Sequence, residues 1–116
     1  MYYQSIFEMI EPSLPTGWKK VIVFVWVSAG CREIKFYVKC SDGKYIDCFQ
    51  LDMNKKDVVM LLLNLQNCIF ESENAKWNIM TIAFDENEMC KVDYDYEKTD
   101  LNHAVIIENW KKQYLV

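Results

Sequence analysis

The sequence predicts an α+β fold with an antiparallel sheet of about five strands and flanking helices, in the order α-β-β-β-α-β-β-α. Three observations lead to this class. Strand-like segments fall into two groups, and short turn signals join the strands within each group. Segments with apolar residues at helical spacing precede, separate and follow the groups. The 116 residues, of which 52% are hydrophobic, can bury one core and fit a single domain over residues 1–116.

The first half of the chain predicts a helix followed by three strands. Residues 2–11 have apolar side chains at helical spacing and are followed by prolines, which end a helix. Residues 18–27 are almost all β-branched or aromatic, which is typical of a strand that is covered on both faces or lies centrally in its sheet. Apolar and polar residues alternate over residues 33–40, and Asp42-Gly43 then predicts a tight turn into a third strand.

The second half predicts a long helix, a second hairpin and a last helix. Apolar residues over 58–69 form a wide helical stripe, and Asp52 or Asn54 can cap this helix. Residues 77–96 predict two strands joined by a polar turn. A last helix is predicted over residues 100–113, with an aspartate as its cap.

The two turns also predict strand registers. A two-residue turn in the first hairpin places Cys40 opposite Tyr45, and a four-residue loop over residues 85–88 places Ala83 opposite Cys90. Because side chains alternate along a strand, the second register divides that hairpin into two faces. The face expected in the core holds Trp77, Ile79, Thr81, Ala83, Tyr94 and Tyr96, and the other face holds Met80, Ile82 and Phe84.

Composition and charge exclude several classes of protein. The longest uninterrupted apolar run, residues 21–27, is too short to span a bilayer. Thirteen basic and seventeen acidic residues give a net charge of −4, which argues against nucleic-acid binding and permits a basic partner. Five cysteines without a CxxC motif, and a start without a basic signal segment, predict reduced thiols in a cytoplasmic protein that does not bind membranes.

Catalytic motifs are not apparent in the sequence. His103, the single histidine, has no cysteine near it in sequence and belongs to no HExxH pattern. The serines lack the GxSxG context of a nucleophile, and no glycine-rich loop opens a helix to hold phosphate. We therefore expect a protein that is not an enzyme and that has no cofactor, catalytic residue or metal site.

Acidic residues gather in the second hairpin. Asp93, Asp95 and Glu97 have a period of two, so they project from one face of a strand, and the preceding turn adds further carboxylates. Such a row can bind a divalent cation, keep a solvated face soluble, or dock a basic protein. Composition alone favours the solvated face over docking. The candidate docking residues are Asp93, Asp95 and Glu97, with Asp85, Glu86 and Glu88 as a second patch and Met80, Ile82 and Phe84 as an apolar centre.

Several segments, in order along almost the whole chain, resemble the YezG-like family of bacterial antitoxin and immunity proteins. The most specific are Trp77-Asn78 and the run Asp93-Tyr94-Asp95-Tyr96-Glu97. The remaining segments are residues 17–21 (GWKKV), 33–37 (EIKFY), 44–45 (KY), 90–92 (CKV), 110–111 (WK) and 114–115 (YL). The chain departs from the family pattern in being short, rich in cysteine and less acidic in its middle helix.

The resemblance implies a small cytoplasmic protein that binds a cognate secreted toxin and blocks its activity. Such proteins act in polymorphic-toxin loci, including contact-dependent growth inhibition systems, and the toxin is often a nuclease. Nuclease active sites are lined with Lys and Arg, so an acidic surface could occupy one. Two alternatives remain: a protein-interaction module of another bacterial assembly, and a small-ligand-binding α+β domain with a pocket between helix and sheet.

Overall fold

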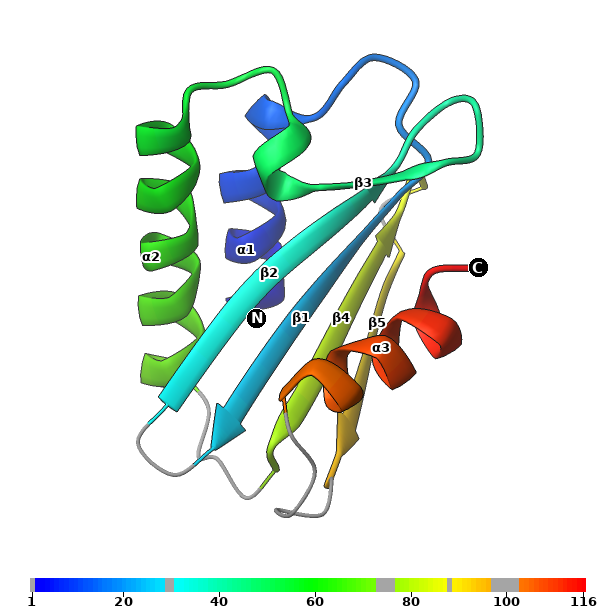
Figure 1. The fold of residues 1–116 in the computed structure, drawn as a ribbon. Helices are drawn as coiled ribbons and strands as arrows, with labels where there is room; N and C mark the ends of the chain where they lie inside the picture. Colours follow the sequence, from blue (N-terminus) through cyan, green and yellow to red (C-terminus); the bar gives the residue numbers. More distant parts are fainter. Residues whose placement is uncertain (1, 29–30, 73–76, 88, 97–102) are drawn as a thin grey trace.

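The computed structural model describes residues 2–28, 31–72, 77–87, 89–96 and 103–116 (Figure 1). Its elements confirm the predicted α+β class and the predicted order of helices and strands, with two short 3-10 helices in addition. In chain order they are α1 (Tyr2–Ile10), η1 (Glu11–Ser13), β1 (Lys20–Ser28), β2 (Cys31–Lys39), β3 (Tyr45–Asp47), η2 (Cys48–Gln50), α2 (Lys55–Ser72), β4 (Ile79–Asp85), β5 (Cys90–Asp95) and α3 (His103–Tyr114).

The five strands form one sheet with the order β3-β2-β1-β4-β5, and all neighbouring strands are antiparallel. β1 is central and pairs along most of its length with β2 on one side and β4 on the other. This position confirms the prediction from its continuous apolar run, because a strand in the middle of a covered sheet has two buried faces.

Helices cover both faces of the sheet, which gives three layers. Figure 1 shows α1 and α2 on one side of the strands and α3 on the other. The face under α1 and α2 carries Val21, Val23 and Val25 of β1, which are fully buried in the larger core. The opposite face carries Ile22 and Phe24, which pack under α3 in a second, smaller core. The alternating side chains of one strand therefore anchor both helical layers.

The smaller core depends on Trp110 of α3. Its ring lies 4.8 Å from that of Phe24 and 5.4 Å from that of Tyr37, measured between ring centroids. Its indole Nε1 donates a hydrogen bond of 2.9 Å to the hydroxyl of Thr81 on β4. Thr81 and Trp110 are both buried, so this hydrogen bond gives each polar group a partner in a place that water does not reach. Through this one residue, α3 contacts three neighbouring strands: β1, β2 and β4.

The longest described helix, α2, is apolar on one side only. Val58, Leu65 and Ile69 are buried against the sheet, whereas Asn64 and Asn67 face solvent. The Asn54 side chain caps the start by accepting a 2.9 Å hydrogen bond from the backbone N–H of Asp57, and Asn54 is one of the two caps that the sequence predicts. Among the helices that the structure describes, none has the combination of length and apolar character that a bilayer crossing requires.

The hairpin between β2 and β3 has a three-residue loop, so its predicted register is wrong by one residue. The backbone N–H of Cys40 donates to the carbonyl of Lys44 at 2.8 Å, and Tyr45 pairs with Lys39. Gly43 has a φ of 85°, which glycine adopts without the cost that a Cβ would bring. A turn that ends in such a residue is the usual way to close a three-residue loop.

The second hairpin differs from its predicted register in the same way. The N–H of Asp85 donates to the carbonyl of Met89 at 3.1 Å and Phe84 pairs with Cys90, so residues 86–88 form the connection in place of residues 85–88. A shift of one residue exchanges the two faces of a strand relative to its neighbour. On one face, Cys90, Val92 and Tyr94 thus lie beside Phe84, Ile82 and Met80, and on the other face Lys91, Asp93 and Asp95 lie beside Ala83, Thr81 and Ile79.

We predict that replacing Thr81 by valine lowers the free energy of unfolding by about 1–3 kcal/mol, because it leaves the Trp110 indole N–H buried without an acceptor. The double variant T81V/W110F removes both partners, so it should lose less than the sum of the two single variants. Urea unfolding monitored by circular dichroism measures both effects, and T16V at an exposed threonine is the control. Additive losses in the double variant would contradict the prediction.

Stability should also fall at alkaline pH through Tyr37. Burial, with a further contribution from the nearby Asp47 carboxylate, raises the pKa of Tyr37 to about 12 from its ordinary value of 10.0. As the pH rises from about 10 to about 12, the unfolded chain loses this proton first, so the free energy of unfolding falls. Y37F should show a shallower fall over this range in urea unfolding at stepped pH. Equal slopes in the two proteins would contradict the assignment.

Candidate protein-binding surface

Asp93 and Asp95 lie side by side on the face of β5 that points toward the α3 layer. Asp93 pairs with Thr81 and Asp95 pairs with Ile79 on the neighbouring strand. Asp93 is half-buried and Asp95 is exposed, because α3 covers the inner strands of this face more fully than the outer one. The structure therefore brings two of the predicted acidic residues together on an accessible face, and we call this pair the acidic strip.

The acidic strip borders the C-terminal end of α3. The hydroxyl of Tyr114 donates a hydrogen bond of 3.4 Å to Oδ2 of Asp93. Burial raises the pKa of Tyr114, and the charges of Asp93 and Asp95 act in the same direction. The tyrosine hydroxyl therefore keeps its proton at neutral pH and stays a donor to the carboxylate. This contact orients Asp93 and leaves Asp95 facing water.

The carboxylates of the turn lie at the other end of β5 and do not continue the acidic strip. Asp85 pairs with Met89 at the start of this strand, whereas Asp95 is its last residue. Oδ1 of Asp85 accepts hydrogen bonds from the backbone N–H groups of Asn87 and Met89 at 2.9 and 3.0 Å. Asp85 thus holds the turn together, and Glu86 is exposed. Glu88 and Glu97 of the predicted patches lie outside the described residues.

Met80, Ile82 and Phe84 are not on an open face, so their prediction as an apolar binding centre is wrong. Met80 and Ile82 are fully buried and Phe84 is 3% exposed, in the core beneath α1 and α2. The reason is that β4 lies between β1 and β5 with helices on both sides of the sheet. The sequence prediction assumed that one face of this hairpin stayed open.

Two tyrosines at the end of β5 are exposed. Tyr94 is 44% exposed and Tyr96 is 70% exposed, which corrects the expectation that both point into the core. Tyr94 lies on the α1 side of the sheet, where its ring centroid is 5.9 Å from that of Trp77 and its hydroxyl is 3.1 Å from that of Tyr3. Tyrosine offers a large apolar ring with a polar tip, a combination that is enriched in protein interfaces.

The described residues include side chains that can bind a metal ion or act as a nucleophile. No group of three or more metal-ligating side chains occurs among them. The cysteines described (Cys40, Cys48, Cys68 and Cys90) are free thiols, and burial raises the pKa of Cys48, Cys68 and Cys90, which keeps these three protonated. His103 contacts the carboxylate of Glu33, and its ring lies 4.9 Å from that of Trp26.

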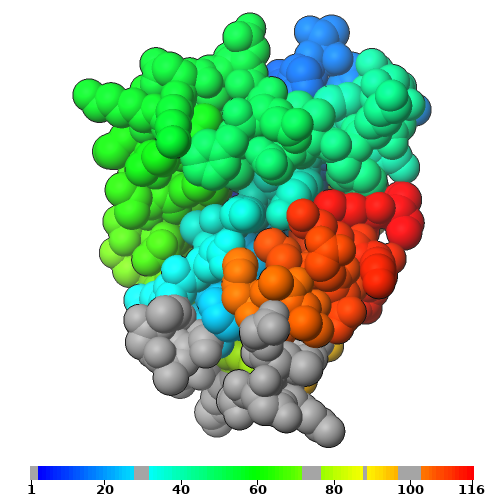
Figure 2. Space-filling view, in the orientation of Figure 1, coloured from blue at the N-terminus to red at the C-terminus, as the bar shows by residue number. Residues whose placement is uncertain are grey.

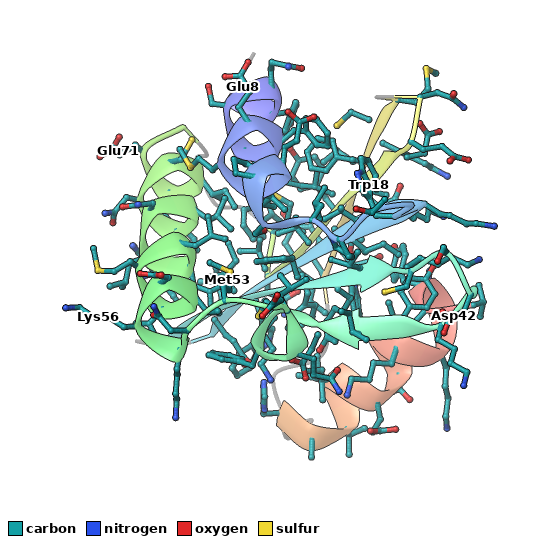
Figure 3. All side chains as sticks on the ribbon, turned by 90° about the horizontal axis from the view of Figure 1, so that it is seen from above. Glu8, Trp18, Asp42, Met53, Lys56 and Glu71 are labelled. Atoms are coloured by element: carbon teal, nitrogen blue, oxygen red, sulfur yellow. The ribbon has the colours of Figure 1, made fainter. Side chains whose placement is uncertain are left out.

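The sequence reasoning missed a groove of about 820 Å³ between the η1 segment and the N-terminal half of α2. Its floor and walls combine methionines with carboxylates, and Met60 is half-exposed there. Helical spacing cannot distinguish such a methionine from a core residue, because the neighbouring helix decides which side of the stripe is covered. The lining includes Met9, Leu14, Asp52, Met53, Asp57 and Met60. Figure 3 shows Met53 next to α2.

Comparison with known proteins returned no match: no protein-family model fits the chain, and no curated protein is similar enough to be matched to it. The surface of the chain itself and the resemblance of its segments are therefore what support a function.

We predict different roles for the two carboxylates of the turn. Asp85→Ala should lower the free energy of unfolding by about 0.5–2 kcal/mol, because two backbone donors lose their acceptor. Glu86→Ala, at the next and exposed position, should change it by less than about 0.5 kcal/mol. Urea unfolding of the two variants beside the parent protein checks this, and equal effects would show that Asp85 is not a structural residue.

Proposed function

We propose that this chain is an immunity protein, which binds a cognate secreted toxin domain in the cytoplasm and neutralises it by stoichiometric protein–protein inhibition. The observation that supports this most is the acidic strip, since Asp93 and Asp95 share an accessible sheet face. Their run in the sequence is also a main part of the resemblance to YezG-like proteins. The partner expected from this surface is a basic domain, of which a nuclease active site is the leading example.

Charge favours such a partner in two ways. The net charge of −4 attracts a basic domain over a distance set by the ionic strength. At contact, the exposed Asp95 and the oriented Asp93 can accept hydrogen bonds from Lys or Arg side chains that otherwise hold phosphate. Inhibition then follows because the same basic residues cannot bind nucleic acid at the same time.

The tyrosines next to the acidic strip supply the apolar part of an interface. Tyr94 and Tyr96 alternate with Asp93 and Asp95 along the chain. Because of this alternation, the tyrosines lie on the opposite side of the sheet from the acidic strip. Rings of this size contribute most when they become fully desolvated at the centre of a contact. An acidic pair beside two tyrosines therefore combines orientation by charge with affinity from burial.

The first test is affinity capture of the tagged chain from its own host, followed by mass spectrometry of the bound proteins. We expect the C-terminal domain of a large secreted protein, bound in equal amounts. The purified domain should cleave nucleic acid and should lose this activity when one equivalent of the chain is added. A captured component of another assembly, or no partner from cells that express a neighbouring toxin, would overturn the proposal.

Reversing the charge of the acidic strip should weaken binding to the captured toxin domain. We expect D93K/D95K to reduce the affinity at least about a hundredfold, as the loss of two charged contacts at an interface typically does. The matched control is E8K/E71K, which makes the same charge change on α1 and α2, away from α3 (Figure 3). Isothermal titration calorimetry measures both. Equal affinities of the two variants, with circular dichroism unchanged, would show that the acidic strip is not the binding surface.

A further inference from the structure

The groove between the η1 segment and α2 has an apolar floor. Of the residues that line it, Leu51 is buried, and four more are partly buried and packed against the larger core: Leu14, Ile46, Met53 and Leu61. The floor is therefore a surface of the core that the helical layer leaves open at this end of the molecule. Contact with an apolar partner would remove this surface from water.

Methionines reach this groove from three parts of the chain. Met9 belongs to α1, Met53 to the segment before α2, and Met60 to α2 itself. Met9 is 36% exposed and Met60 is 50% exposed, so both present their side chains to a partner. Methionine is unbranched and its sulfur is polarizable, so it adapts to partners of different shape. We call this site, defined by Met9, Met53 and Met60, the methionine groove.

The methionine groove is extended along the two helices. A second hollow, of about 410 Å³, adjoins it at Met9 and Asn64 and continues between α1 and α2 to Asn67 and Cys68. Figure 1 shows these helices side by side on one face of the sheet. From Asp57 to Asn67 the axis of α2 rises about 15 Å, or about three helical turns. This shape fits a short helix that lies along α1 and α2.

The rim of the methionine groove is acidic. Asp52 and Asp57 are exposed there, and the described residues that line the groove include no lysine or arginine. Lys55 and Lys56 are close in sequence, but helical spacing turns them roughly 200° and 100° around α2 from Asp57. Figure 3 shows the Lys56 side chain directed away from α1. Charge complementarity therefore favours a cationic occupant.

The described polar groups of the groove favour a protein segment over a small ligand. The Ser13 hydroxyl donates to the carbonyl of Ile10 at 2.6 Å, and Oε1 of Gln50 accepts from the backbone N–H of Asp47 at 2.8 Å. Asn64 is exposed at the rim. A small-ligand site has polar groups that converge inside an apolar cavity, whereas a protein interface has an apolar centre and a polar rim.

We propose that the methionine groove binds a short basic amphipathic helix of a partner protein. The apolar face of this helix packs on Met9, Met53 and Met60, and its Lys or Arg side chains reach the carboxylates of Asp52 and Asp57. The inference does not rest on the immunity function, because the groove lies in the α1–α2 layer and the acidic strip lies on the α3 side of the sheet. The test below uses no toxin, so failure of one proposal leaves the other standing.

The test is NMR of the purified chain with ¹³C-labelled methionine methyl groups. The probe is a capped synthetic peptide of about 12 residues, with leucines on one helical face and lysines on the other. We expect the methyl signals of Met9, Met53 and Met60 to shift and to saturate at one peptide per chain. Met80, which is fully buried, and Met89, which is exposed near the β4–β5 turn, should keep their signals unchanged.

Matched variants separate the groove from general charge and from folding. D52N/D57N should weaken peptide binding about fivefold or more, while E86Q/E108Q neutralises two exposed carboxylates elsewhere and should leave it within about twofold. M60Q should also weaken it about fivefold, and M89Q, at another exposed methionine, should not. Circular dichroism checks each fold, and D52N alone keeps the test valid if loss of Asp57 destabilises the first turn of α2.

Four results would overturn the proposal. The first is the absence of methyl shifts at about 1 mM peptide. The second is equal binding of a control peptide with glutamate in place of lysine. The third is octylammonium ion binding the groove as tightly as the peptide, which would show a small-molecule site. The fourth is a shift of the same methyl signals with protein concentration alone, which would show that a second copy of the chain fills the groove.

Discussion

The two-sided burial of β1 is the interaction on which the rest of the molecule depends. Val21, Val23 and Val25 are fully buried under α1 and α2, while Ile22 and Phe24 are buried under α3. β2 and β4 pair with this strand on both sides, so its backbone groups are satisfied within the sheet. Each helical layer is thus held by alternate side chains of the same strand, and neither layer could pack without it.

The unequal cover of the two sheet faces determines where polar chemistry can lie. Two helices cover one face, and there even the residues of β4 near the edge, such as Met80 and Ile82, are fully buried. One helix of twelve residues covers the other face, centred on Phe24 and Trp110. Figure 2 shows β2 (cyan) exposed between α2 (green) and α3 (orange) on this side. Carboxylates on the outer strand of this face remain in contact with water, where their charge is not penalised by burial.

Carboxylates that look alike in the sequence have different physical roles. Asp85 accepts two backbone hydrogen bonds and stabilises a turn, Asp93 is oriented by Tyr114, and Asp95 is exposed at the end of its strand. Of these three carboxylates, Asp93 and Asp95 are the ones that lie on the accessible face of β5.

The sequence by itself determined the fold class, the order of the elements and the central position of β1, because hydrophobic periodicity and turn residues are local properties of the chain. It also located the acidic segment, since the period of two already places Asp93 and Asp95 on one face. Only the tertiary structure decided which face that is and what lies beside it. The β2–β3 loop and the β4–β5 loop each contain three residues, and a difference of one residue exchanges the two faces of a strand. A further reason explains why the core includes Met80, Ile82 and Phe84. Whether a strand has one covered face or two depends on where distant helices pack. Alternation along the strand does not contain that information.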